Sequence, residues 1–191
     1  HEAGKSALDW RTSGGPLVFN SIYTSEHYDA RLEQPGWSSP GFDDSAWGGV
    51  MYRGAPSQRV TAQQTVPIRN VTEYRPRSVR KLDERSYLYD FGQNMAGVTK
   101  LRLRGEAGTQ LRLIHAERLR EDGHADLSNI DVYFRPTDKD DLFQTDVVTL
   151  SGRDDEFMPR FNYKGFRYVE VVADRPVELS AENLTAYAMH S

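Results

Sequence analysis

The sequence predicts an all-β fold: an antiparallel β-sandwich preceded by an extended, loop-rich segment. Three observations favour it. The strongest windows alternate apolar and polar residues with a period of two, as half-buried strands do. Clusters of Gly, Pro and Asp separate these windows at near-regular spacing, which is typical of a sandwich. Long stretches with the 3.6-residue period of an amphipathic helix are hard to find.

The clearest strands flank a four-residue turn. Residues 98–104 and 111–116 alternate in polarity on either side of Gly105-Glu106-Ala107-Gly108, which predicts a hairpin. Further short strands are expected at residues 87–91, 131–134, 145–150, 166–172 and 184–189. We therefore place one sandwich at residues 68–191.

Residues 1–67 have a different character. Gly14-Gly15-Pro16 precedes an apolar stretch at residues 17–19 that predicts a single strand. Residues 35–54 are crowded with Gly, Pro, Ser and Asp, yet they include Trp37 and Trp47. Flexible linkers carry few large aromatic rings. We therefore expect an ordered loop whose rings pack on a neighbouring domain.

Composition argues against several classes of function. The 191 residues hold 24 Lys and Arg against 28 Asp and Glu, and a net charge of −4 argues against nucleic-acid binding. No apolar run approaches the roughly 18 residues that a membrane helix needs. The absence of Cys excludes disulfides, zinc–thiolate sites and thiol nucleophiles. Because the chain opens on His1 rather than Met, we expect a piece of a longer protein.

No catalytic residue is predicted. A serine triad is not expected, since the sequence holds no G-x-S-x-G elbow. His115 falls on a predicted strand, where a lone histidine is usually structural. A glycosidase needs two carboxyl groups facing each other across a cleft, and no pair among the 28 acidic residues stands out.

Calcium is the one metal that stays open. Zinc is excluded, because the chain has neither a cysteine pair nor an H-E-x-x-H motif. Asp138, Asp140 and Asp141 offer oxygen ligands of the kind that calcium prefers. Their spacing lacks the Gly and the distal Glu of an EF-hand loop, and Lys139 lies among them. A solvated turn is the favoured interpretation.

Carbohydrate binding is the chemistry that the first segment supports. Sugar-binding proteins stack exposed aromatic rings on pyranose rings and surround them with Asp, Asn, Gln and Arg. The candidate carbohydrate-binding residues are Glu26, Asp29, Arg31, Trp37 and Trp47. The alternative, which we favour for the charged residues, is an ion pair to Arg31 that pins the loop. Exposed tryptophans would favour a sugar site, and buried ones a domain joint.

Several motifs, in order along the chain, resemble those of one enzyme family. Y-T-S-E-H-Y-D-A-R at residues 23–31, G-W at 36–37 and G-F-D-D-S-A-W at 41–47 resemble the end of the N-terminal module of bacterial α-L-rhamnosidases. V-P-I-R at 66–69 resembles the family's linker into its next sandwich. D-F-G-Q-N-M-A-G at 90–97 and P-R-F-N-Y-K-G-F-R-Y-V at 159–169 resemble two segments of that sandwich.

The resemblance implies a jelly-roll or concanavalin-like sandwich at residues 68–191, with residues 1–67 as the end of the N-terminal module plus a linker. In such enzymes a large helical toroid carries the acidic catalytic residues, which remove terminal α-L-rhamnose with inversion. The implied partners are this toroid, as the rest of the parent enzyme, and rhamnose-containing glycans or glycosides. The cellular compartment stays open.

Three hypotheses about function follow. The first is a non-catalytic β-sandwich fragment of a rhamnosidase, which supports the toroid or helps to recognise substrate. The second is an autonomous, calcium-dependent rhamnose-binding module. The third is a purely structural spacer.

Overall fold

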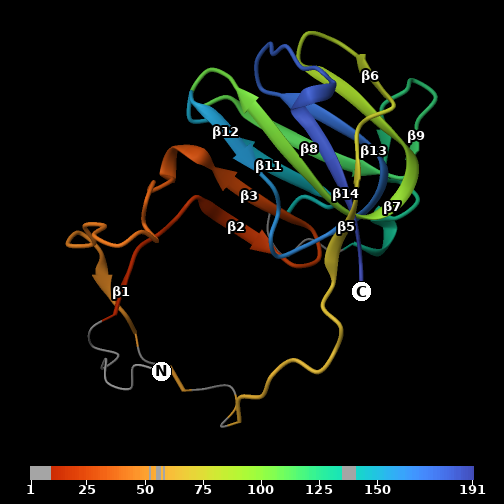
Figure 1. Ribbon diagram of the computed structural model, residues 1–191. Helices are drawn as coiled ribbons and strands as arrows, with labels where there is room; N and C mark the ends of the chain where they lie inside the picture. Colours follow the sequence, from red (N-terminus) through yellow and green to blue (C-terminus); the bar gives the residue numbers. More distant parts are fainter. Residues whose placement is uncertain (1–9, 52, 55–56, 58, 135–140) are drawn as a thin grey trace.

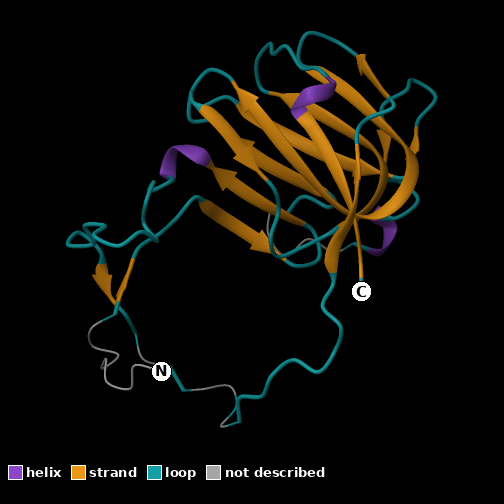
Figure 2. Ribbon diagram, viewed as in Figure 1, coloured by secondary structure: helices purple, strands orange, loops and turns teal. Residues whose placement is uncertain are grey.

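The computed structural model describes residues 10–51, 53–54, 57, 59–134 and 141–191. In these residues the regular structure is nearly all β, and ten strands form one sheet (Figures 1 and 2). The strands of this sheet are β2 Leu17–Ser21, β3 Ser25–Asp29, β5 Arg69–Tyr74, β6 Ser78–Lys81, β7 Ser86–Arg104, β8 Gln110–Ala116, β11 Thr145–Thr149, β12 Asp154–Phe157, β13 Lys164–Ala173 and β14 Leu184–His190. Their order is β2-β3-β11-β8-β13-β7-β14-β5, and β6 and β12 also pair with β7.

The sheet curls over itself into a sandwich, so the predicted fold class is confirmed (Figure 2). Its described strand pairs are antiparallel apart from β3 and β11, which run parallel. Among the described residues, no helix is long and apolar enough to cross a membrane.

The long strand β7 connects the two layers. Its first part, Ser86 to Asp90, pairs with β13 and partly with β6. From Gly97 onward it pairs with β14, and its end pairs with β12. At Gly97 an added Cβ would lie 2.0 Å from the carbonyl oxygen of Tyr187. Only a residue without a side chain permits this approach between β7 and β14.

One apolar core lies between the layers. Tyr89 and Phe166 are its largest fully buried side chains. Phe91 meets Phe166 edge to face, with the ring centroids 6.0 Å apart. In β8, Leu111 and Leu113 are fully buried while the residues on either side of them along most of the strand face outward. The period-two sequence pattern is therefore the pattern of burial.

The first segment adds strands to this same sheet. β2 pairs with β3, and β3 pairs with β11 of the sandwich. The two-residue strands β1 (Arg11–Thr12) and β4 (Gly48–Gly49) form a separate ladder, which lies away from the curled sheet in Figure 1. The division of the chain at residues 67 and 68 stays a prediction about the modules of the parent protein.

Two local predictions are wrong. Residues 98–104 and 111–116 are strands but do not form a hairpin, because β13 lies between β7 and β8 and pairs with both. Alternation reveals a strand without revealing its partner, and here the partner comes from residues 164–173. The strand expected at residues 131–134 is instead the 3-10 helix η3, Asp131–Tyr133, closed by the Phe134 N–H bond to the Asp131 carbonyl.

Candidate functional site

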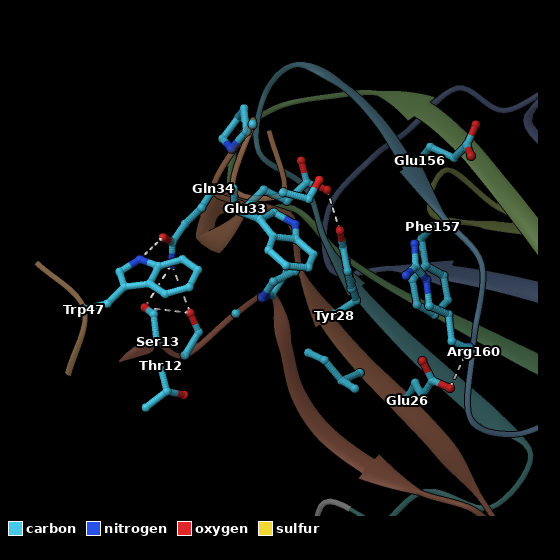
Figure 3. A pocket seen from close by; sticks show the side chains of 18 of the residues that line it. Thr12, Ser13, Glu26, Tyr28, Glu33, Gln34, Trp47, Glu156, Phe157 and Arg160 are labelled. Carbon is cyan, nitrogen blue, oxygen red and sulfur yellow. Dashed lines mark hydrogen bonds between the residues drawn. The ribbon is translucent and has the colours of Figure 1, made fainter. Parts of the chain in front are cut away.

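A cleft of about 740 Å³ opens between the first segment and one side of the sandwich (Figure 3). Tyr28 and Glu26 reach it from β3, and Glu156 and Phe157 reach it from the end of β12. The remaining lining residues are Arg11, Thr12, Ser13, Gly14, Gly15, Pro16, Leu17, Glu33, Gln34, Pro35, Gly36, Trp37, Ser38, Trp47, Met158, Arg160 and Phe161.

The two candidate tryptophans both line this cleft but differ in exposure. Trp37 is 63% exposed. Trp47 is half-buried, packs against Phe42 at a centroid distance of 5.6 Å and donates its indole N–H to Gln34 Oε1 at 2.8 Å. Trp47 is therefore fixed by its neighbours, as expected for an ordered loop, whereas Trp37 is a mostly exposed residue of the cleft lining.

Glu26 also lines the cleft, yet its carboxylate is committed to the protein. The residue is only 2% exposed. Its Oε1 accepts the backbone N–H groups of Arg160 at 2.9 Å and Phe161 at 2.6 Å, and the Asn162 side-chain amide at 3.3 Å. Burial raises the pKa of Glu26, and the two backbone hydrogen bonds oppose that rise. Glu26 thus fixes the loop between β12 and β13 to β3.

Asp29 and Arg31 lie outside the lining of the cleft. Arg31 donates from Nε and Nη2 to the two oxygens of Asp29, at 2.9 and 2.6 Å. Asp29 also caps the 3-10 helix η2, Ala30–Leu32, by accepting the Arg31 backbone N–H. The hydrogen bond from the Arg31 side chain lowers the pKa of Asp29. This is the loop-pinning ion pair that the sequence made the favoured interpretation.

Polar residues outside the five candidates complete the cleft, and of these sequence reasoning missed Ser13, Glu33 and Gln34. The Tyr28 hydroxyl donates to Glu33, and burial raises the pKa of Tyr28. Gln34 donates to Ser13 and the Gly14 carbonyl while it accepts from Trp47. Alternation within β3 placed Tyr28 and Glu26 on one face, and that was the available signal for Tyr28. The partners from residues 13–14 and 156–161 carry no local signal.

A buried polar network lies behind the cleft. Lys164 Nζ contacts both oxygens of Asp146, at 2.7 and 2.8 Å, and Asn162 Oδ1 at 2.6 Å. The Glu26 backbone N–H donates to the same Asp146 carboxylate at 2.9 Å. Lys164 and Asp146 are 4% and 0% exposed. The network joins β3, β11 and β13, so the first segment is held to the sandwich by buried charges.

Within the part of the chain that the structure describes, no group of three or more His, Cys, Asp or Glu side chains could hold a metal ion. Asp138 and Asp140 lie outside the described residues. Asp141 is buried and accepts a hydrogen bond from the Thr24 hydroxyl. Its carboxylate therefore serves to tie the β2–β3 turn to the sandwich.

His115 is a core residue. It is fully buried, with Nε2 2.9 Å from Thr99 Oγ1, Nδ1 3.2 Å from the Gln144 carbonyl oxygen and its ring against Phe166. Burial lowers the pKa of His115 to about 4. The enclosed imidazole lies outside the lining of the cleft.

The two motifs of the predicted sandwich, at residues 90–97 and 159–169, contact each other. Arg167 donates from Nε and Nη2 to the Asp90 carboxylate at 2.9 and 2.8 Å. Asp90 also accepts the backbone N–H of Gly92, whose φ of +76° favours glycine. The D-F-G and G-F-R segments therefore stabilise the β7–β13 pairing, and their charged groups are used for structure.

Comparison with known proteins agrees with this fold. The family described as "Bacterial alpha-L-rhamnosidase concanavalin-like domain" matches residues 80–190, and the "Alpha-L-rhamnosidase N-terminal domain" matches residues 2–72. An α-L-rhamnosidase of Streptomyces avermitilis is 40% identical over 190 residues, which cover 97% of this chain and 17% of that protein. An α-L-rhamnosidase of Formosa agariphila is 33% identical over 165 residues, covering 85% of this chain and 17% of that protein.

Solved structures give the same result. The crystal structure of the Streptomyces avermitilis α-L-rhamnosidase complexed with L-rhamnose superposes with a TM-score of 0.82 at 39% identity, over 96% of this chain and 17% of that one. The native enzyme from Aspergillus terreus gives 0.81 at 34% identity, over 97% of this chain and 21% of that one.

The fold defines the class, an all-β protein with a concanavalin-like sandwich. With a family match over most of its length, the chain belongs to the bacterial α-L-rhamnosidase family. It spans about a sixth of the length of the curated relatives that it matches.

Proposed function

We propose that this chain is a non-catalytic β-sandwich segment of an α-L-rhamnosidase whose parent hydrolyses terminal, non-reducing α-L-rhamnose. One observation carries the proposal. The match to the Streptomyces avermitilis α-L-rhamnosidase includes 97% of this chain but only 17% of that protein. In this proposal the segment supports the rest of the parent enzyme, including its catalytic toroid, and helps to recognise the rhamnoside.

The contacts of three carboxylates support a non-catalytic role. General acid–base chemistry needs a carboxyl group that can reach the substrate and exchange a proton with it. In the described residues, Glu26 is bound by backbone amides, Asp146 by Lys164, and Asp90 by Arg167. Each of these contacts stabilises the fold and engages the carboxylate with a partner within the protein.

The cleft supports the recognition role. We assign the contact with a sugar ring to Trp37 and Trp47, because aromatic faces stack on the apolar faces of pyranoses. Glu26, Asp29 and Arg31 act behind this surface by holding the loops that form it.

Turnover of an aryl α-L-rhamnoside tests the non-catalytic assignment. The purified 191-residue chain should release no more aryl alcohol than buffer does, while the parent enzyme should release it readily. Hydrolysis by the isolated chain at a rate near that of the parent contradicts the proposal.

The second candidate function is an autonomous, calcium-dependent rhamnose-binding module. The exposed face of Trp37 in the cleft is the observation that favours it. Titration calorimetry with L-rhamnose should then show millimolar or tighter binding that weakens when calcium is chelated. Trp37→Ala should abolish the signal, whereas Trp10→Ala, an equally exposed tryptophan outside the cleft lining, should leave it unchanged. A flat titration with and without calcium removes this candidate.

A further inference from the structure

Arg160 is a charged residue of the cleft to which the proposed function gives no role. It belongs to the loop between β12 and β13 and lines the cleft together with Tyr28 and Phe157. Figure 3 shows its side chain extending from this loop toward Phe157. Burial raises the pKa of Tyr28, and the positive charge of Arg160 opposes that rise. The guanidinium therefore lies within electrostatic range of the Tyr28 hydroxyl inside the cleft.

The Arg160 guanidinium has no partner among the described residues. The backbone N–H of Arg160 donates to Glu26, but within the part of the chain that the structure describes its side chain makes neither a hydrogen bond nor an ion pair. Arg11, the other cation of the cleft lining, donates to the carbonyl groups of Asp44 and Ser45 at 3.2 and 3.1 Å. A guanidinium is always protonated and can only donate, so the side chain of Arg160 is open to an acceptor from a ligand.

The three acids of the cleft lining are engaged within the protein. The Glu156 carboxylate lies 2.8 Å from Lys100 Nζ and 2.7 Å from Arg102 Nε, and these contacts lower its pKa. Glu33 accepts a hydrogen bond from a tyrosine hydroxyl. Glu26 is buried beneath the loop between β12 and β13. Among the described residues of the lining, the charge that remains available to a ligand is therefore positive.

The backbone that carries this charge is fixed from behind. The N–H groups of Arg160 and Phe161 donate to the Glu26 carboxylate at 2.9 and 2.6 Å. The Asn162 side chain bonds both Glu26 and Lys164. A fixed backbone loses little conformational freedom when a ligand binds, so more of the contact energy remains for affinity. Arg160 is thus held at the cleft as a preorganised donor.

We propose that the cleft recognises rhamnosides in which the sugar next to rhamnose carries an anionic group, a carboxylate or a sulfate ester, and that Arg160 binds this group. The inference rests on the proposed function, which assigns the contact with a sugar ring to Trp37 and Trp47. A planar guanidinium donates two parallel hydrogen bonds to the paired oxygens of such anions. A cleft of about 740 Å³ is in the size range of pockets for drug-sized ligands, so it has room for a second sugar ring.

Three disaccharides that differ at one group test the proposal. α-L-Rhamnosyl-glucose is neutral, α-L-rhamnosyl-glucuronic acid carries a carboxylate at the same position, and α-L-rhamnosyl-glucose 6-sulfate carries a sulfate ester there. In titration calorimetry at low salt, the 191-residue chain should bind at least one anionic disaccharide about fivefold or more tightly than the neutral one. The anion that gains the affinity identifies the group as carboxylate or sulfate. A smaller preference, or binding of none of the three, overturns the proposal.

Salt gives a second readout that needs no mutation. Dissolved ions screen the attraction between charges that solvent can reach. The preference for the anionic disaccharide should therefore decrease as sodium chloride rises from about 20 to about 500 mM, while the affinity for the neutral disaccharide should change little. A preference that salt leaves unchanged would come from the shape of the sugar and overturns the role of Arg160.

A matched pair of variants tests Arg160 itself. Arg160→Gln removes the charge but keeps the backbone N–H that Glu26 accepts, so the melting temperature should stay unchanged. Its preference for the anionic disaccharide should fall to less than half of the wild-type value. Arg120→Gln, at an exposed arginine outside the cleft lining, should keep the wild-type preference. Retention of more than half of the preference in Arg160→Gln overturns the proposal.

Failure of the inference and failure of the proposed function give different results. Equal binding of the three disaccharides refutes the anionic preference and leaves the recognition of rhamnose in place. Binding of none of them refutes the recognition role as well. Turnover of an aryl rhamnoside by the 191-residue chain refutes the non-catalytic assignment, and it does not alter a measured preference for the anion.

Discussion

At the scale of single residues, the acids near the cleft show that a carboxylate next to aromatic rings can stabilise the fold and need not bind a sugar. The sequence grouped Glu26 and Asp29 with two tryptophans as a candidate sugar site. The structure shows Glu26 buried under a loop and Asp29 paired with Arg31. No local sequence pattern distinguishes a structural carboxylate from a sugar-binding one. The groups that donate hydrogen bonds to Glu26 come from residues 160–162, more than 130 positions away.

Glu26 should make stability fall as pH rises. Its folded pKa lies above the unfolded value near 4.5, so its contribution is full below that value and is lost as pH rises through the folded pKa. Glu26→Gln removes this dependence. In urea unfolding from pH 4 to pH 8, the wild type should lose free energy of unfolding relative to Glu26→Gln as pH rises.

The matched variant Glu26→Ala leaves the loop donors without an acceptor and should cost about 2–4 kcal/mol at pH 4, where Glu26 contributes fully. Parallel pH profiles for the wild type and Glu26→Gln would show that the Glu26 pKa is not raised.

His115 should act in the opposite direction. Its folded pKa of about 4 lies below the unfolded value of 6.5, so its contribution is present above pH 6.5 and is lost as pH falls toward 4. NMR titration should show the His115 imidazole neutral down to about pH 5. A midpoint between 6 and 7 would show that the ring is hydrated in the folded chain.

The Lys164–Asp146 pair should be the costliest charge pair to break. Lys164→Met leaves Asp146 buried without its counter-ion, which typically costs about 3–5 kcal/mol. Lys100→Met removes a more exposed pair with Glu156 and should cost less than about 1 kcal/mol. Chemical denaturation of both variants gives their free energies of unfolding. Equal losses of that free energy would show that burial does not make the Lys164–Asp146 pair more important.

At the scale of elements, alternation located the strands but not their pairing. Strands expected at residues 87–91, 145–150, 166–172 and 184–189 are present, within a residue or two at most ends or inside longer strands. The strand expected at residues 87–91 is longer than predicted, because β7 continues beyond Phe91 as a single 19-residue strand. The continuation depends on pairing with β13 and β14, which are distant in sequence, so a short window could not reveal it.

A substitution at Gly97 tests the close approach of β7 and β14. Gly97→Ala should cost about 3 kcal/mol or more, because the new Cβ would overlap the Tyr187 carbonyl and force the strands apart. Gly49→Ala, where nothing lies within 4 Å of the added carbon, should be nearly neutral. Thermal unfolding of the two variants measures this difference in stability. An unchanged melting temperature for Gly97→Ala would mean that the two strands can move apart without loss of stability.

At the scale of the whole molecule, ordered motifs were more informative than any single site. The resemblance at residues 23–47, 90–97 and 159–169 led to the family that the comparisons show. These motifs contact one another in the structure: Asp90 binds Arg167, and Glu26 binds the backbone of residues 160 and 161. The cleft could not be foreseen, since its walls come from five separate stretches of chain.

The central proposal is that this segment of an α-L-rhamnosidase contributes structure and recognition, and that it does not carry out the catalytic step. Side-by-side hydrolysis of an aryl α-L-rhamnoside, with equal molar amounts of the 191-residue chain and the full-length parent, tests it most directly. The account predicts turnover by the parent and none above buffer by the chain. Turnover by the chain that persists through purification and is lost on its unfolding would contradict the account.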